Sequence, residues 1–201
     1  MFNGKILALW PNHLSAMDRV QLLDKTFHLF LSEVQIQKAI QRLAKELTAA
    51  YEGRPMLLLG ILNGSFLVTA DLMRHLPTET EVTFIRLSSY GNEMESSGKT
   101  HEVLGLNFSL EGRHVIVVED IVDTGHTIAF LDEHLRQQQP ASLEVCSLLY
   151  KPDNLVAGHP PHYTGFEIPP EFVVGYGLDY AQHGRGLRAI YRWLGEENET
   201  A

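Results

Sequence analysis

Short apolar runs alternate with amphipathic segments along this chain of 201 residues. The runs have the length of buried strands, and the segments between them repeat apolar residues at helical spacing. We predict strands over residues 56–61, 81–89, 114–119 and 143–150. Because strands and helices alternate, the pattern predicts an α/β fold with a mostly parallel central sheet that is flanked by helices.

The helix signals agree with this order. Ser32 is followed three residues later by Gln35, which makes a capping box, and apolar residues then recur at helical spacing as far as Tyr51. Further helices are expected over residues 66–75 and from about Thr127.

The remaining segments carry weaker patterns. Residues 90–102 are rich in Gly, Ser and charge without periodicity, which predicts a mobile loop. Residues 172–180, "FVVGYGLDY", are interpreted as a last core strand or a strand edge. We expect one domain over residues 29–195, an N-terminal extension over 1–28 and a polar tail over 196–201.

Three polar loops directly follow predicted strands: "LNGS", "EDIVDTGHT" and "YKPDN". The carboxyl ends of parallel strands meet at one edge of a sheet, and ligands bind there in open α/β folds. The three loops are therefore expected to share one site.

The composition narrows the class of protein. A formal net charge of −9 argues against a broad nucleic-acid footprint, which requires a basic face. The single cysteine excludes an intrachain disulfide, the N-terminus is a poor signal peptide, and no apolar stretch approaches the ~20 residues of a membrane span. We expect a soluble, cytoplasmic protein with no nucleic-acid or membrane partner.

Three carboxylates stand at the end of the predicted strand 114–119 and just beyond it. They are Glu119, Asp120 and Asp123. A solvated loop or a helix cap explains one of them well, but not all three. Crowded carboxylates raise one another's pKa unless a cation or hydroxyl donors face them. Their natural partners are a magnesium ion, sugar hydroxyls or a proton that is to be moved.

The next four residues, Thr124, Gly125, His126 and Thr127, have the complementary character of an anion site. Hydroxyls, a glycine and the N–H groups of a helix start form a phosphate site. The P-loop pattern G-x-x-x-x-G-K-[ST] does not occur in the chain, and no dinucleotide fingerprint is present. A phosphate at one end and hydroxyls or a metal at the other fit a phosphorylated sugar.

The stretch "VIVVEDIVDTGHT" resembles the phosphoribosyl diphosphate (PRPP) motif of the type I phosphoribosyltransferases. "LNGSF", "SSYGNE", "YKPDN" and "FVVGYGLDY" resemble the pyrophosphate loop, the lid and the purine-binding segments of hypoxanthine-guanine phosphoribosyltransferases. The resemblance covers residues 30–191. It implies a Rossmann-like core, a small hood formed by terminal segments, and a homodimer or homotetramer.

By this resemblance, Glu119 and Asp120 face the ribose hydroxyls of PRPP, and residues 124–127 wrap its 5′-phosphate, with His126 acting through its backbone. Asp123 handles the proton on N7 of the purine as a general base or acid. A carboxylate suits this position because the reacting sugar becomes oxocarbenium-like and negative charge stabilises it.

The resemblance also assigns the purine-binding residues. Lys151 donates to the oxygen at C6, and a pure donor favours a 6-oxopurine over adenine. Phe172 stacks on the base, Val173 offers backbone groups to its edge, and Asp179 completes the segment. Taken alone, Lys151 is a solvated lysine before a proline, and Phe172 is a core aromatic residue.

The remaining assignments concern pyrophosphate, metal and lid. Asn63, Gly64 and Arg185 contact pyrophosphate, and the peptide bond between Leu62 and Asn63 is expected to be cis; some family members carry a basic residue where Asn63 stands. Mg²⁺ binds near Asp179, with Glu119 and Asp120 as further metal-binding candidates. Ser89 and Tyr90 belong to a lid that excludes water.

The implied activity is magnesium-dependent transfer of the phosphoribosyl group of PRPP to hypoxanthine or guanine, which yields IMP or GMP and pyrophosphate. A xanthine-preferring enzyme and an RNA-binding regulator on the same fold are the alternatives. A phosphohydrolase with Asp120 as nucleophile would need a D-x-D arrangement, which is absent here.

Overall fold

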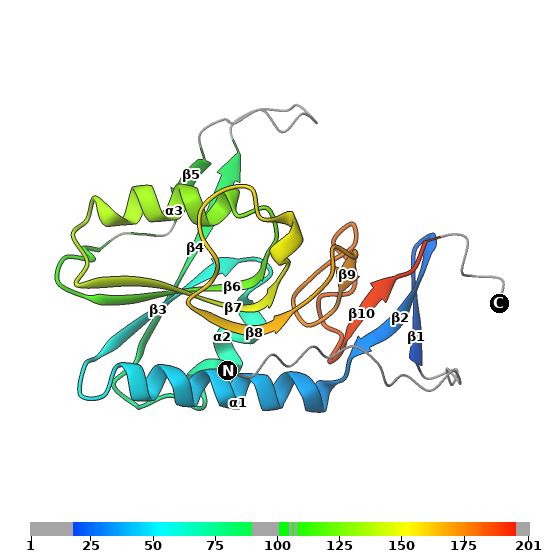
Figure 1. Ribbon diagram of the computed structural model, residues 1–201, viewed down its shortest axis with the longest axis horizontal. Coiled ribbons are helices and arrows are strands. Elements are labelled where there is room, and N and C mark those ends of the chain that lie inside the picture. The colour runs from blue at the N-terminus through cyan, green and yellow to red at the C-terminus, as the bar shows by residue number, and fades with distance from the viewer. Residues whose placement is uncertain (1–17, 90–100, 105, 107, 196–201) are drawn as a thin grey trace.

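The computed structural model describes residues 18–89, 101–104, 106 and 108–195 (Figure 1). Over this part of the chain the strands form two sheets, one of six strands and one of four. The larger sheet carries the helices, and the smaller one lies beyond its edge on the side of β8 in the view of Figure 1.

The six-stranded sheet has the order β5-β4-β3-β6-β7-β8. Five of its strands run parallel, and only β5 is antiparallel to its neighbour β4. This confirms the mostly parallel sheet that the sequence predicts. The strands are β3 (Met56–Leu62), β4 (Glu81–Ser89), β5 (His101–Leu104), β6 (His114–Val122), β7 (Ser142–Tyr150) and β8 (Tyr163–Glu167).

Helices cover both faces of this sheet (Figure 1). They are α1 (Glu33–Ala50), α2 (Phe66–Met73) and α3 (His126–Arg136), and the short 3-10 helix η2 (Pro152–Asn154) follows β7. Because successive strand residues point to opposite faces, Leu58 and Val118 pack in the core under α1 and α2, whereas Leu59 and Val117 pack under α3.

The start of α1 confirms the predicted capping box. The backbone N–H of Gln35 donates to the hydroxyl of Ser32 at 3.4 Å, and the side-chain oxygen of Gln35 accepts from the backbone N–H of Ser32 at 3.0 Å. The helix ends at Ala50, with Tyr51 as its C-cap.

The four-stranded sheet is built from the two ends of the described chain. Its order is β1-β2-β10-β9, and all its pairs are antiparallel. The strands are β1 (Arg19–Leu22), β2 (Lys25–Leu31), β9 (Val173–Val174) and β10 (Ile190–Trp193). The resemblance implied a hood formed by terminal segments, and this sheet is built from such segments, so we call it the hood.

The sequence pattern missed several elements. β1, β2, β8 and β10 lie outside the segments predicted as strands, because short strands in a small sheet or at a sheet edge need no continuous apolar run. The predicted boundary between residues 28 and 29 falls inside β2. The division of the chain into an N-terminal extension and a domain stays a prediction. The helix expected over 66–75 ends at Met73.

Two predicted segments differ from the structure. Within residues 172–180 only Val173 and Val174 form a strand, and that strand is at the edge of the small sheet and not in the six-stranded sheet, although Val173 packs in the hydrophobic core; the positive φ angles at residues 175–177 turn the chain away. The loop predicted over 90–102 is wrong at its end, because residues 101 and 102 pair with β4 as part of β5. Its residues 90–100 lie outside the described part of the chain.

Among the described residues, no helix combines the length and the hydropathy that are needed to cross a membrane.

Candidate active site

The three polar loops meet at one edge of the large sheet, as predicted. They follow β3, β6 and β7, which are neighbours in the strand order and run parallel, so their carboxyl ends lie together. The segment 175–189, which connects β9 to β10, reaches over the same edge from the small sheet. The site is therefore formed by the loops after β3, β6 and β7 together with the segment between β9 and β10, which we call the strap.

The loop after β3 packs closely against Asp120 at Gly64, and the strap packs closely against the same loop at Gly177. A Cβ atom on Gly64 would lie 1.7 Å from Oδ2 of Asp120, and a Cβ atom on Gly177 would lie 2.0 Å from the carbonyl oxygen of Gly64. Both positions require the absence of a side chain, and Gly177 also has a φ of +104°. The loop after β3 is thus held between the Asp120 carboxylate and the strap.

The loop after β3 has the expected backbone geometry. The peptide bond between Leu62 and Asn63 is cis, as the resemblance implied. Asn63 is exposed, whereas Gly64 and Ser65 are buried. The backbone N–H of Thr69 donates to the carbonyl of Ser65 at 2.8 Å, so α2 continues directly from the loop. Asn63 is therefore the side chain of this loop that is open to a ligand.

Glu119 and Asp120 form a pair of adjacent carboxyl groups, the first buried and the second half-buried. Glu119 is only 6% exposed. Burial, together with the neighbouring Asp120, raises the pKa of Glu119 well above its ordinary value. Burial also raises the pKa of Asp120 to about 6, although the backbone N–H of Ile121 and the Arg185 guanidinium act in the opposite direction. Such a pair is stabilised by any ligand that brings a cation or hydroxyl donors.

Asp123 and Lys151 lie in contact across two neighbouring strands. The ammonium group of Lys151 donates to Oδ2 of Asp123 at 2.7 Å, and the side-chain amide of Asn154 donates to Oδ1 at 2.7 Å. Although burial alone would raise it, these two hydrogen bonds hold the pKa of Asp123 below its ordinary value. Asp123 is therefore held ionised, and it becomes a stronger proton acceptor when a ligand draws one of these donors away.

The segment 124–127 curves around the start of α3. Gly125 is the N-cap residue with a φ of 81°, and a Cβ atom there would lie 2.0 Å from the carbonyl oxygen of Ala157. Thr124 and His126 are exposed, and Thr127 is half-buried. Because the first N–H groups of a helix have no partner within it, these residues are suited to bind an anion, and we call them the anion cradle.

Phe172 lies in a cluster of aromatic residues in and beside the small sheet. Phe172 is 45% exposed, and its ring centroid lies 5.9 Å from that of Tyr180 and 6.2 Å from that of Phe27. Phe172 is therefore not a core aromatic residue, which is what its residue type alone suggests. Val173 is buried in β9 and is paired with Arg192 of β10, so its backbone is fixed by the hood sheet.

Asp179 and Arg185 face each other within the strap. Nη2 of Arg185 lies 2.7 Å from Oδ1 of Asp179, and Nη1 donates to the carbonyl of Gly177 at 2.8 Å. The guanidinium therefore holds the ends of the strap together beside Gly64. Among the described residues, no three His, Cys, Asp or Glu side chains gather closely enough to bind a metal by themselves.

Of the two predicted lid residues, only Ser89 lies in the described part of the chain. Ser89 is the last residue of β4. Tyr90 lies outside the described residues, so the lid stays a prediction.

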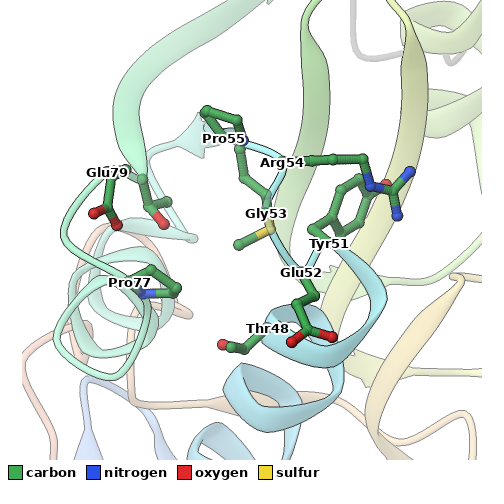
Figure 2. Close-up of a pocket in the computed structure, with 10 residues that line it drawn as sticks. Thr48, Tyr51, Glu52, Gly53, Arg54, Pro55, Pro77 and Glu79 are labelled. Atoms are coloured by element: carbon green, nitrogen blue, oxygen red, sulfur yellow. The ribbon is translucent and has the colours of Figure 1, made fainter.

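A cavity of about 450 Å³ lies elsewhere, between the end of α1 and the turn before β4 (Figure 2). Tyr51, Arg54, Pro77 and Glu79 are among the side chains around it. It adjoins the amino end of β3 at Met56, opposite to the loops after β3, β6 and β7. None of the predicted site residues lines it.

The structure adds Asn154 to the predicted set. The motif "YKPDN" was noted for Lys151 only, and its asparagine follows a proline in a way that is typical of a turn. The 3-10 helix η2 places Asn154 back beside Asp123. Spacing alone does not reveal this contact, because it joins residues 31 positions apart.

Comparisons with known proteins agree with this arrangement. The family model described as "Phosphoribosyl transferase domain" matches residues 31–181. The hypoxanthine-guanine phosphoribosyltransferase of Bacillus subtilis is 41% identical over 162 residues, which cover 81% of this chain and 90% of that protein. The bifunctional protein TilS/HprT of Listeria innocua is 42% identical over 162 residues, which cover 81% of this chain but only 25% of that protein. The chain thus spans about a quarter of the length of this relative.

A solved structure is similar over the same region. The crystal structure of a hypoxanthine-guanine phosphoribosyltransferase from Bacillus anthracis, with a HEPES molecule in its active site, superposes with a TM-score of 0.76 at 39% identity. The match covers 82% of this chain and 96% of that one.

Proposed function

The chain belongs to the phosphoribosyl transferase family, and we propose that it transfers the 5-phosphoribosyl group of PRPP to hypoxanthine or guanine. The products are IMP or GMP and pyrophosphate. The observation that carries this proposal is the Lys151–Asp123 contact, which lies directly before the anion cradle of residues 124–127. The site thus offers a hydrogen-bond donor, a carboxylate and a phosphate site in one place.

In this proposal, PRPP lies along the carboxyl ends of β3 and β6. Residues 124–127 bind its 5′-phosphate through N–H groups and hydroxyls. Glu119 and Asp120 accept from the ribose hydroxyls, which stabilises the ionised form of two carboxyl groups whose pKa is raised by burial. Asn63, Gly64 and Arg185 contact the pyrophosphate. Because Asn63 is uncharged, Arg185 is the cationic side chain that we assign to this group.

The base lies against Phe172, with backbone groups of Val173 at its edge. Lys151 donates to the oxygen at C6, and Asp123 accepts the proton from N7 as N9 forms its bond to C1′ and the bond from C1′ to pyrophosphate breaks. Lys151 already touches Asp123 in the absence of a base, so a small shift of one side chain suffices to serve both. A 6-amino group at the same place would present a donor to a donor.

We further propose that Mg²⁺ binds with the pyrophosphate group beside Asp120, Glu119 and Asp179. The donor set fits, since two adjacent carboxyls with raised pKa values gain from a divalent cation. Magnesium takes one or two carboxylates and completes its shell with water and phosphate oxygens, so a cluster of three protein ligands is not required. When bound, it neutralises charge on the leaving pyrophosphate.

The assembly and the compartment follow from the same assignment. We propose a homodimer or homotetramer of cytoplasmic location, with PRPP and a purine base as its ligands and without a nucleic-acid or membrane partner. The net charge of −9 and the single cysteine support this view.

The test is a base panel. The protein is incubated with PRPP and Mg²⁺ and with hypoxanthine, guanine, xanthine or adenine separately, and the nucleotide and pyrophosphate formed are measured. We expect turnover of hypoxanthine or guanine and none of adenine. Turnover of xanthine alone would show that xanthine, and not hypoxanthine or guanine, is the base. The absence of turnover with every base would overturn the proposed function. A gel-shift assay with RNA serves as the parallel test of the regulatory alternative.

A further inference from the structure

Tyr176 connects the hood strap to the helix that follows the pyrophosphate loop. Its hydroxyl donates to Oδ2 of Asp71, on α2, at 2.5 Å. The amide of Gln37, on α1, donates to the same oxygen at 2.7 Å. Tyr176 is only 4% exposed, whereas the Asp71 side chain is 22% exposed, so the contact lies at the border of the core. One carboxylate of α2 thus receives a donor from α1 and a donor from the strap.

The backbone around Tyr176 is fixed on both sides. The N–H of Tyr176 donates to the carbonyl of Leu187 at 2.9 Å, and the N–H of Gly177 donates to the carbonyl of Arg185 at 2.9 Å. Gly175 and Leu178 exchange a pair of hydrogen bonds across the turn. The strap therefore behaves as one rigid turn, and Tyr176 is its side-chain anchor on the core.

The residue after Tyr176 touches the loop that precedes α2. Gly177 packs on the carbonyl of Gly64 so closely that a Cβ atom would lie 2.0 Å from the oxygen. Asp71 stands six residues after Ser65, which is about 9 Å along the axis of α2. Residues 176 and 177 thus fasten the strap both to the helix and to the loop from which the helix starts.

From these contacts we propose that Tyr176 and Asp71 are positioning residues for PRPP. Their hydrogen bond holds the loop at Asn63 and Gly64 and the strap bearing Asp179 and Arg185 at a fixed separation, which is the width of the pyrophosphate site. Neither residue touches the substrate in this arrangement. The inference rests on the proposed function, because it assigns the loop and the strap to pyrophosphate.

The protonation of Tyr176 is consistent with a fixed donor. Burial and the hydrogen bond to Asp71 raise the pKa of Tyr176 above its ordinary value. The hydroxyl therefore stays protonated over the working range of pH and continues to donate.

The test compares two buried tyrosines. Tyr176→Phe keeps the ring and removes the hydroxyl. We expect the KM for PRPP to rise roughly tenfold, the size of one lost hydrogen bond to a charged group, while the KM for the base changes less than about twofold. The matched control is Tyr51→Phe, since Tyr51 is 5% exposed and its hydroxyl lies 3.2 Å from that of Ser142, away from the site. It should lower stability and leave both KM values unchanged.

Asp71→Asn keeps an oxygen that can accept from Tyr176, so its effect on the KM for PRPP should be smaller than that of Asp71→Ala. The double variant Asp71→Ala/Tyr176→Phe should be no worse than the worse of the two single variants, because both remove one interaction. Additive effects of the two changes would contradict a shared role.

A second measurement does not depend on turnover. Amide hydrogen exchange of the ligand-free protein should show faster exchange over residues 64–69 in Tyr176→Phe than in the wild type, and no change there in Tyr51→Phe. If Tyr176→Phe matches Tyr51→Phe both in exchange over this segment and in the KM for PRPP, the positioning role is refuted. If the wild type converts no base, the proposed function fails, and the exchange result alone decides whether Tyr176 fixes the loop.

Discussion

Nζ of Lys151 lies 2.7 Å from Oδ2 of Asp123. The two residues follow neighbouring strands of the sheet, β7 and β6, and the N–H of Lys151 also donates to the carbonyl of Val122 at 2.9 Å. The Lys151 side chain is 9% exposed, whereas that of Asp123 is 40% exposed. The lysine is thus held in place behind a carboxylate that remains open to a ligand. In the proposed reaction, this contact couples recognition of the base by Lys151 to proton acceptance by Asp123.

The first prediction concerns Asp123. Asp123→Asn preserves the size of the side chain but removes the negative charge that accepts the proton and stabilises the reacting sugar. We expect kcat to fall by at least about 100-fold, which is the lower range for loss of a general base. The affinity for PRPP, measured by calorimetry, should change less than about threefold.

Asp132→Asn is the control for this variant, since Asp132 carries a similar carboxylate that lies 2.7 Å from Nε of Arg136 on the surface of α3. It should leave kcat unchanged. An equal loss of turnover and PRPP binding in Asp123→Asn would show that Asp123 is only a binding residue.

The second prediction concerns the choice of base. Lys151→Gln replaces an obligate donor by an amide that can donate or accept. We expect turnover of hypoxanthine and guanine to fall and the discrimination against adenine to shrink, as measured by the ratio of kcat/KM values. The loss of the lysine hydrogen bond should also let the pKa of Asp123 rise, because that bond now lowers it. An unchanged ratio between hypoxanthine and adenine would refute the role given to Lys151.

The central sheet was predictable because its strands are buried on both faces. Residues 56–61 and 114–119 read as continuous apolar runs, and the structure places them side by side in the middle of the sheet. The hood was not predictable in this way. Buried and partly buried residues of β2 come in pairs and not in strict alternation, and β10 is four residues long, so neither carries a distinct pattern. Their pairing joins segments about 160 residues apart, which no local signal encodes.

The site shows the same division. The motif after β6 predicts its own chemistry, because its carboxylates and its phosphate cradle are adjacent in sequence. The contacts that hold the site together are long-range. Asn154 on Asp123, Tyr176 on Asp71 and Gly177 on Gly64 each depend on how distant loops approach one another. Such contacts become visible only once the chain is folded.

The third prediction uses the close approach at Gly64. In Gly64→Ala the new methyl group would overlap the Asp120 carboxylate, so the loop or the carboxylate must move. We expect the KM for PRPP to rise more than about tenfold, or turnover to be lost, with the fold retained by circular dichroism. Gly186→Ala is the control, because a Cβ atom there would meet nothing within 4 Å. Wild-type kinetics in Gly64→Ala would show that the loop does not define the PRPP site.

The fourth prediction concerns the metal. Removal of Mg²⁺ with EDTA should abolish turnover, and added Mg²⁺ should restore it, because the proposed Mg²⁺ binds with the pyrophosphate and neutralises its charge beside the carboxyl groups of Glu119, Asp120 and Asp179. Asp179→Asn should raise the Mg²⁺ concentration needed for half-maximal rate. Full activity in EDTA would remove the metal from the proposed reaction.

The last prediction concerns the effect of pH on the ligand-free, metal-free protein. Asp120 has a pKa of about 6 in the folded protein and 3.8 as its ordinary value, which we take for the unfolded chain. Between these two values the folded state therefore binds more protons than the unfolded state, so the free energy of unfolding rises as the pH falls from 8 to 5. The stabilisation is complete below the unfolded value and is lost as the pH rises through about 6. Its size is at most about 3 kcal/mol.

The measurement is urea unfolding at pH 8 and pH 5 in EDTA. The wild type should gain stability at pH 5, and Asp120→Asn, which has no charge to bury, should be more stable than the wild type at pH 8 and should lose much of the pH dependence. Glu119 acts in the same direction, because burial raises its pKa as well, so Glu119→Gln should also flatten the curve. Identical pH curves for the wild type and both variants would mean that burial does not destabilise the charged forms of Glu119 and Asp120. A site that is less stable when ionised and empty is one that gains from a ligand bearing hydroxyls and a cation, which is the character of PRPP with Mg²⁺.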